Sequence, residues 1–229
     1  MKKLLSIYCF GYLVLLAVVV VLLCLYPKLE LHLMLNAIHT RLLDTFFKYY
    51  TMMAEGPIYV LALLPILWKQ IRMTLFFGLC ELTGGTVLQL MKHLISTDRP
   101  ASLFEHYQGA VLPLVPGVDM HYGNSFPSGH ASTFFVFCTC CALVLAYHYR
   151  QQGNGGTSKC FVCRLSLLAL LMLAGLGAYS RVYLSQHFLC DVCVGSVIGF
   201  VTPCLLFFFA GNRILKLKKT ETPALQPAG

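Results

Sequence analysis

Long apolar blocks with almost no charge are the feature of this sequence that most restricts its fold. An α-helix needs about 20 apolar residues to cross the hydrocarbon core of a membrane. Of the 229 residues, 58% are apolar and only 11% are charged, whereas about 25% are charged in an ordinary soluble domain. This pattern excludes a soluble domain, a disordered chain, a coiled coil and a collagen-like chain. It predicts an all-α, polytopic membrane protein with a single integral-membrane domain.

Six of the blocks are predicted to be transmembrane helices. They cover residues 5–26, 52–68, 73–95, 128–149, 165–180 and 188–210. The first block is longer than the apolar core of a signal peptide and no small-residue cleavage site follows it, so we expect it to be retained. From Leu31 to Lys48, apolar residues at helical spacing alternate with charged ones, which predicts an amphipathic helix at the membrane interface. Residues 220–229 are predicted to be a disordered tail.

The distribution of basic residues predicts the orientation of the helices. Six spans place both chain ends on one side of the membrane, and short loops rich in Lys and Arg stay in the cytoplasm. Most of the 17 basic residues fall on the side of the termini: Lys2, Lys3, Lys69, Arg72, Arg150, Lys159, Arg164, Arg213, Lys216, Lys218 and Lys219. We therefore expect cytoplasmic termini. The formal charge is +8, and the positive-inside rule explains where these positive charges lie. No nucleic-acid partner is therefore predicted.

The 11 cysteines do not predict a disulfide framework or a metal site. Most of them lie inside the apolar blocks, where cysteine behaves as a small hydrophobic residue. Cys160 and Cys163 have the spacing of half a zinc site, but no second pair lies beside them. We therefore predict that the protein binds no metal.

Three clusters of polar residues lie within or beside the predicted spans. Ionisable groups are costly in such places and mark candidate functional sites. The clusters run from Lys92 to Pro100, from Asn124 to His130 and from Ser180 to Asp191. In the six-span topology all three reach the non-cytoplasmic surface. We therefore expect them to form one site there.

The cations of these clusters suit a phosphate group. Lys92, Arg99 and Arg181 supply three positive charges, and guanidinium groups bind phosphate oxygens in pairs. Ser128 and Gly129 begin a predicted helix, so their free backbone N–H groups and the positive end of the helix dipole favour an anion. The sequence thus predicts a phosphate-binding pocket.

Two histidines and a carboxylate could supply the chemistry. His187 and Asp191 are four residues apart at the start of the sixth span, which is expected to place them on one helical face. The carboxylate can then hold one imidazole nitrogen as N–H and leave the other free as a nucleophile. His130 is available as a general acid. Each residue alone has an ordinary structural explanation, but a non-catalytic membrane protein has little reason to gather all of them.

This set resembles the signature of the type 2 phosphatidic acid phosphatase (PAP2) family, which shares its site with vanadium haloperoxidases and bacterial acid phosphatases. The signature is Lys, six residues, Arg-Pro; then Pro-Ser-Gly-His; then Ser-Arg, five residues, His, three residues, Asp. The sequence matches every position: Lys92, Arg99, Pro100, Pro127, Ser128, Gly129, His130, Ser180, Arg181, His187 and Asp191.

The resemblance implies a lipid phosphatase that works through a phosphohistidine intermediate without a metal or other cofactor. His187 is expected to attack phosphorus, with Asp191 holding it, and His130 to protonate the leaving oxygen. The resemblance also implies which residues bind and stabilise the equatorial phosphate oxygens: Lys92, Ser128, Gly129, Arg99 and Arg181.

The substrate is less constrained than the reaction. The short six-span form is similar to bacterial members of the family, which implies an inner-membrane protein whose site faces the periplasm. Lipid A is the favoured substrate, and undecaprenyl diphosphate and phosphatidylglycerophosphate are alternatives. A phosphotransferase, and a protein that binds or flips lipid phosphates without hydrolysis, also remain open. The loop of residues 101–126 is long enough to shape a headgroup pocket, and the sequence does not reveal an oligomeric state.

One acidic residue lies inside a predicted span. Glu81, in the third span, is explained best by a helix-packing hydrogen bond to a neighbouring span.

Overall fold

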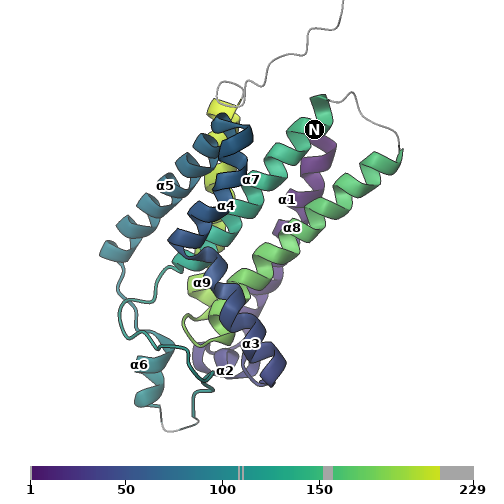
Figure 1. Cartoon of the computed structure of the whole chain (residues 1–229). Helices are drawn as coiled ribbons and strands as arrows, with labels where there is room; N and C mark the ends of the chain where they lie inside the picture. Colours follow the sequence, from purple (N-terminus) through teal and green to yellow (C-terminus); the bar gives the residue numbers. More distant parts are fainter. Residues whose placement is uncertain (1, 108, 110, 152–156, 212–229) are drawn as a thin grey trace, which may run out of the picture.

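The computed structural model describes residues 2–107, 109, 111–151 and 157–211. All the regular structure in these ranges is helical (Figure 1). The predicted disordered tail, residues 220–229, lies outside the described residues. The chain is a polytopic membrane protein with an all-α fold, as predicted.

Five helices are long and apolar enough to cross a membrane. They are α1 (Lys2–Leu25), α5 (Ile71–Leu94), α7 (Gly129–Gln151), α8 (Thr157–Tyr183) and α9 (Leu189–Leu206), which continues in a π-helical turn, Phe207–Gly211. Four of them begin and end within a few residues of the predicted first, third, fourth and sixth spans. The fifth predicted span, 165–180, is too short, because α8 continues past both of its ends.

The region before α5 differs from the prediction. The expected amphipathic helix is two helices, α2 (Lys28–Leu35) and α3 (Arg41–Tyr50). The helix stops after Leu35 because Asn36 adopts a non-helical conformation, and it restarts when the Thr40 side chain accepts a hydrogen bond from the N–H of Leu43, at 3.3 Å.

The second predicted span, 52–68, is not one straight helix. A 3₁₀ turn, Thr51–Ala54, precedes α4 (Gly56–Lys69). The 14 residues of α4 are about 21 Å long, shorter than the ~30 Å hydrocarbon core. Among the described residues, the pair Arg41–Ala54 and Gly56–Trp68, bent by 67°, is long and apolar enough to count as a sixth span if the two helices are taken together. Pro57 explains the break, because its ring prevents the preceding helix from continuing.

The helix α7 lies at the centre of the bundle and packs against α5, α8 and α9 (Figure 1). Glycines let α9 approach closely: a Cβ atom on Gly199 would overlap the backbone oxygen of Ser132. Polar contacts also join the helices, and Thr133 donates to Glu81 at 2.6 Å. This is the hydrogen bond to a neighbouring span that the sequence predicts for Glu81.

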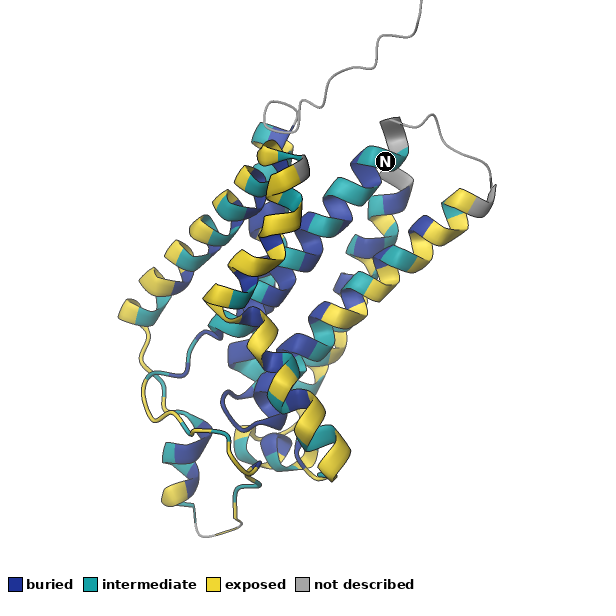
Figure 2. Ribbon diagram, viewed as in Figure 1, coloured by how far each residue is buried: buried dark blue, intermediate teal, exposed yellow. Residues whose placement is uncertain are grey.

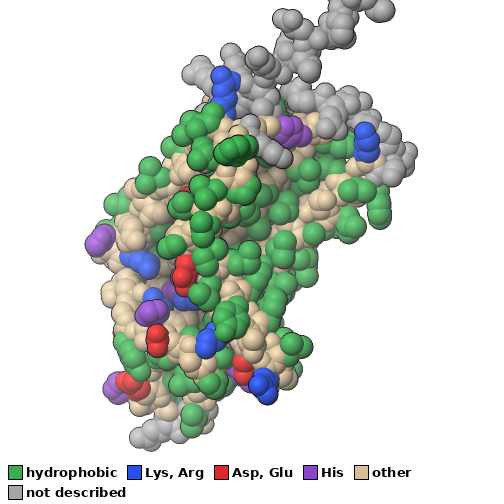
Figure 3. Space-filling model, viewed as in Figure 1, with side chains coloured by type: hydrophobic (Ala, Val, Ile, Leu, Met, Phe, Trp, Pro, Cys, Tyr) green, Lys and Arg blue, Asp and Glu red, His purple; other side chains and the backbone are tan. Residues whose placement is uncertain are grey.

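The outward faces of the helices are apolar, as a lipid-facing surface requires. Exposed residues line the outer side of the bundle (Figure 2), and large hydrophobic side chains such as Leu75, Leu82 and Leu90 of α5 are among them. Figure 3 shows hydrophobic side chains over the middle of the visible face, with histidines and charged side chains concentrated toward its lower end.

The order of the helices separates the two ends of the bundle. The start of α1, the end of α7, the start of α8 and the end of α9 lie at one end (Figure 1). The end of α5, the start of α7, the end of α8 and the start of α9 lie at the other end. Each of the three polar clusters lies at one of these latter helix ends, so the fold brings them together.

Candidate active site

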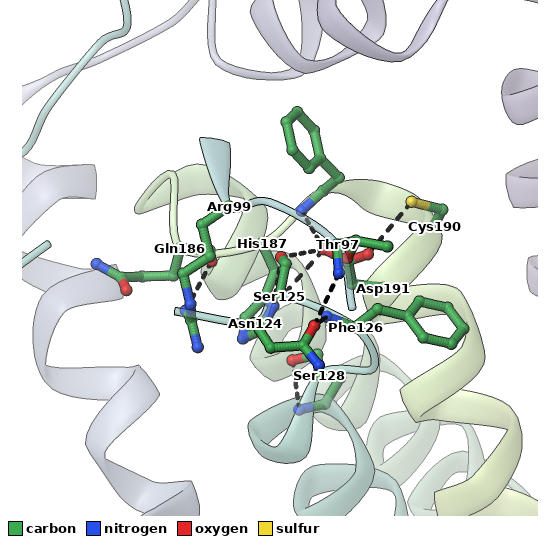
Figure 4. A network of polar contacts seen from close by, with 12 residues as sticks. Thr97, Arg99, Asn124, Ser125, Phe126, Ser128, Gln186, His187, Cys190 and Asp191 are labelled. Atoms are coloured by element: carbon green, nitrogen blue, oxygen red, sulfur yellow. Dashed lines mark hydrogen bonds and ion pairs between the residues drawn. The ribbon is translucent and has the colours of Figure 1, made fainter. Parts of the chain in front are cut away.

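The side chain of Asn124 joins the first polar cluster to the second through hydrogen bonds. Its Nδ2 donates to the backbone oxygens of Lys92 and Ile95, each at 2.8 Å. Its Oδ1 accepts from the backbone N–H groups of Thr97, at 3.0 Å, and Phe126, at 3.2 Å (Figure 4). One amide side chain therefore holds the C-terminal end of α5 against the segment that leads into α7.

Backbone contacts join the second cluster to the third. The N–H of Ser128, just before α7, donates to the backbone oxygen of Asp191 in α9, at 3.0 Å. A Cβ atom on Gly195, one turn further along α9, would overlap the backbone oxygen of Ser128. The two helices can meet this closely only because that position is a glycine.

The position of His187 differs from the expectation. The helix α9 begins at Leu189, and His187 lies in the turn before it. The carboxylate of Asp191 accepts the N–H of Phe188 at 3.0 Å and so caps the first turn of α9. The prediction that His187 and Asp191 share a helical face is therefore wrong. Their side chains still approach, with His187 Nδ1 3.7 Å from Asp191 Oδ2.

The hydroxyl of Ser125 lies between these two side chains (Figure 4). It donates to Asp191 Oδ2 at 2.5 Å, and its oxygen is 3.3 Å from His187 Nδ1. Ser125 is fully buried, and His187 and Asp191 are 3% and 1% exposed. The three groups therefore form one buried polar chain.

Two arginines approach the same place with unused donors. Arg181, 6% exposed, donates from Nη1 to Thr51 Oγ1 at 2.8 Å. Arg99 donates from Nη1 to the backbone oxygen of Gln186 at 2.9 Å. The buried Nε of each arginine has no hydrogen-bond partner in the described part of the chain. Since buried N–H groups are nearly always paired, these donors point to an anionic ligand.

The positive charges reinforce one another. Arg99 interacts electrostatically with both Lys92, in the last turn of α5, and Arg181, in the last turn of α8. No carboxylate forms an ion pair within 4.0 Å of any of the three in the described residues. Their combined potential favours a multiply charged anion.

The N-terminus of α7 faces this group of cations. Ser128 caps the helix, its Oγ accepting the N–H of Ala131 at 3.4 Å. Apart from its chain neighbours and the backbone of its own helix, no atom lies within 4 Å of the position that a Cβ would take on Gly129, so a ligand can approach the backbone there. His130, the second residue of α7, interacts electrostatically with Arg181 and His187. Helix start, cations and both histidines therefore belong to one site.

Burial controls the charge of His187. Burial, followed by the charges of Arg181 and Arg99, lowers the pKa of the imidazole to about 4, although the Asp191 carboxylate acts in the opposite direction. His187 is consequently neutral at pH 7. A neutral imidazole retains the lone pair that a nucleophile needs.

An element outside the predicted site supports the turn that carries His187. Asn36 Nδ2, at the end of α2, donates to the backbone oxygen of Val182 at 2.9 Å. His32 Nε2 lies 3.3 Å from Ser185 Oγ, and burial lowers the pKa of His32 to about 4. Sequence reasoning missed this support, because His32 and Asn36 alternate with apolar residues as exposed polar residues of an interfacial helix do.

Sequence reasoning also missed Ser125, Asn124, Gln186 and Thr51. The first two lie in a cluster that the sequence identified, but nothing in their spacing shows which atoms they contact. Thr51 has no signal at all, because it immediately precedes the second predicted span. For metal binding, no group of three or more His, Cys, Asp or Glu residues in the described ranges is arranged to hold an ion.

Two solved structures are similar to this fold. The crystal structure of LpxE from Aquifex aeolicus superimposes with a TM-score of 0.62 at 22% sequence identity, covering 80% of this chain and 95% of that one. The first transmembrane PAP2-type phosphatidylglycerolphosphate phosphatase from Bacillus subtilis gives a TM-score of 0.57 at 20% identity, covering 93% and 98%. These likenesses show a shared fold.

Sequence comparison agrees with the structural likeness. No curated protein sequence matches the chain at a significant level. A family model described as "PAP2 superfamily" matches residues 73–215, which include all the signature residues from Lys92 to Asp191. The chain therefore belongs to the PAP2 superfamily.

Proposed function

We propose that the protein is a lipid phosphate phosphatase that works through a phosphohistidine intermediate. One observation carries the proposal. Two arginines and the start of α7 lie around a buried, neutral imidazole that is linked through Ser125 to a carboxylate, and Lys92 adds its charge beside Arg99. Membership of the PAP2 superfamily supports a phosphatase.

In the first step, His187 attacks phosphorus as the bond to the leaving oxygen breaks. The Nε2 lone pair forms the P–N bond, and the bonding electrons go to the leaving oxygen, which takes a proton from His130. Because phosphoryl transfer depends mainly on positioning and charge stabilisation, the equatorial oxygens need donors. Arg99, Arg181 and Lys92 supply these donors together with the backbone of Ser128 and Gly129.

In the second step, water attacks phosphorus and the P–N bond breaks. One proton of the water is transferred to His130. The oxygen of the water remains on the released inorganic phosphate. His187 recovers its lone pair, so the enzyme is ready for another turnover. No step of this scheme requires a metal.

The substrate is proposed to be a lipid of the bacterial envelope, reached from the periplasmic side of the inner membrane. Lipid A is favoured, and the fold likeness to LpxE, a lipid A phosphatase, supports this choice. Phosphatidylglycerophosphate is the alternative supported by the second structural neighbour. Undecaprenyl diphosphate is a further alternative.

The test uses purified protein in detergent with a panel of lipid A, phosphatidylglycerophosphate and undecaprenyl diphosphate. We expect phosphate release that vanadate inhibits and a chelator does not. His187→Ala should lower kcat by at least ~10³-fold, because the nucleophile is removed. His93→Ala, which removes an exposed imidazole close to Lys92, is the control and should retain activity. Substantial hydrolysis by the His187→Ala protein would exclude His187 as the nucleophile.

The same panel distinguishes the alternatives. A phosphotransferase should release little phosphate until a second lipid is supplied as acceptor. A binding or flipping protein should bind the lipids without consuming them, and His187→Ala should then change nothing. Formation of an acid-labile, 32P-labelled protein that disappears in His187→Ala would support the phosphohistidine.

A further inference from the structure

We propose that Ser125 is a positioning residue that couples the Asp191 carboxylate to the His187 imidazole through its hydroxyl group. The inference rests on the proposed function, in which His187 is the nucleophile. It deepens that function by adding a residue between the nucleophile and the carboxylate.

The distances favour the indirect route. His187 Nδ1 lies 3.7 Å from Asp191 Oδ2, which is longer than a hydrogen bond. Ser125 Oγ is within hydrogen-bonding distance of both groups, at 2.5 Å from Asp191 Oδ2 and 3.3 Å from His187 Nδ1. The carboxylate therefore contacts the hydroxyl, and the hydroxyl contacts the imidazole.

The number of available protons fixes the direction of the hydrogen bonds that join His187, Ser125 and Asp191. A hydroxyl has one proton to donate and lone pairs to accept with. An ionised carboxylate can only accept, so Ser125 must donate its proton to Asp191. The contact with His187 then requires the imidazole to donate its Nδ1–H to Ser125 Oγ. This places the ring proton on Nδ1 and leaves Nε2 with the lone pair for attack.

The other contacts of Asp191 keep the carboxylate in this place. Its Oδ2 also accepts the N–H of Phe188 at 3.0 Å, and its Oδ1 lies 3.4 Å from Cys190 Sγ. The carboxylate is 1% exposed, so bulk water cannot readily replace Ser125 as the link.

The backbone of Ser125 is held equally firmly. Its N–H donates to the backbone oxygen of Thr97 at 2.8 Å. The neighbouring residue Asn124 is bonded to the carbonyls of Lys92 and Ile95. The hydroxyl is thus fixed relative to the C-terminal end of α5, and the segment that positions Lys92 also orients the nucleophile.

The link becomes stronger during the reaction. When Nε2 bonds to phosphorus, the imidazole ring gains positive charge and Nδ1–H becomes a better donor. The hydrogen bond to the carboxylate makes the Ser125 oxygen a better acceptor for the Nδ1–H group. The hydroxyl keeps its own proton. Removal of the hydroxyl should therefore affect kcat more than KM.

The experiment compares Ser125→Ala, Asp191→Asn and the double variant with the unaltered protein. We expect Ser125→Ala to lower kcat on the order of 10- to 100-fold, with KM changed less than about 3-fold. If Ser125 acts through Asp191, the double variant should be no slower than Asp191→Asn alone. Ser166→Ala, which removes a hydroxyl that donates only to the Val162 backbone oxygen near the start of α8, at the other end of the bundle, is the control and should match the unaltered protein.

A second measurement reports the tautomer directly. In protein labelled with 15N-histidine, the His187 resonances, assigned by their loss in His187→Ala, should show the proton on Nδ1. In Ser125→Ala they should show a mixture of tautomers or a shift of the proton to Nε2. A residue that only fills space would change the melting temperature and leave the tautomer unaltered.

The outcomes separate the inference from the proposed function. Unaltered kcat and tautomer in Ser125→Ala, with an inactive His187→Ala, would overturn the role of Ser125 alone. Effects of Ser125→Ala and Asp191→Asn that multiply fully in the double variant would also overturn it. Activity retained in His187→Ala would overturn the proposed function itself.

Discussion

The protonation state of one residue, His187, sets the pH range in which the proposed nucleophile is active. Burial and two nearby arginines lower its pKa to about 4, compared with about 6.5 for an exposed histidine. The neutral form is the reactive one, and it predominates above the folded-state pKa. Activity should therefore persist through pH 6 and 5 and be lost as the pH falls through about 4.

The pH dependence of kcat/KM checks this prediction, because it reports the ionisation of free enzyme and free substrate. The second ionisation of a phosphomonoester, near pH 6, also contributes. Two substrates whose own pKa values differ should therefore be compared. The acid limb that does not change with the substrate belongs to the enzyme and should lie near pH 4. A substrate-independent limb near pH 6.5 would contradict the lowered pKa.

At the scale of the elements, the close crossing of α7 and α9 keeps the clusters of the site together. Gly199 and Gly195 lie where a side chain would overlap the backbone oxygens of Ser132 and Ser128. Since backbone cannot be repacked as a side chain can, any substitution there must move one helix away from the other. That movement would also displace Ser128 from Asp191 and weaken the site.

Gly199→Ala should therefore destabilise the protein by about 1–3 kcal/mol, the usual effect of overpacking a close contact. Thermal unfolding in detergent measures the change, and phosphate release should decline in parallel. Gly85→Ala on α5 is the matched control, because no atom of another helix lies within 4 Å of its added Cβ. Equal melting temperatures for the two variants would show that the crossing tolerates separation.

The elements also show which helices could be predicted. An unbroken apolar run predicts a membrane-spanning helix, because in lipid only a helix satisfies the backbone hydrogen bonds of a single segment. This rule predicts α1, α5, α7 and α9. The ends of α2, α3 and α4 cannot be predicted in this way, because they depend on Asn36, Thr40 and Pro57, and α2 and α3 also pack against α8. Periodicity alone cannot show that a helical pattern is interrupted by a bend of 67°.

At the scale of the whole molecule, the three clusters meet because α5 and α8 end where α7 and α9 begin (Figure 1). The distribution of basic residues predicts cytoplasmic termini, and on that prediction this end faces the periplasm. A green fluorescent protein fused to the C-terminus should therefore fluoresce. Alkaline phosphatase fused after Glu105, behind three spans, should be active. The opposite pair of results would place the site in the cytoplasm.

The membrane class and the family could be predicted from the amino-acid sequence, because both depend on residue types at fixed spacing along the chain; the same spacing led to the proposed residues of the site. The sequence did not determine how the site is connected. His187 lies in a turn instead of on α9, Ser125 comes between it and Asp191, and α2 supports that turn. These contacts became visible only in the folded chain, because they join residues as much as 153 positions apart, and the direction of a side chain at a helix end depends on what packs against it.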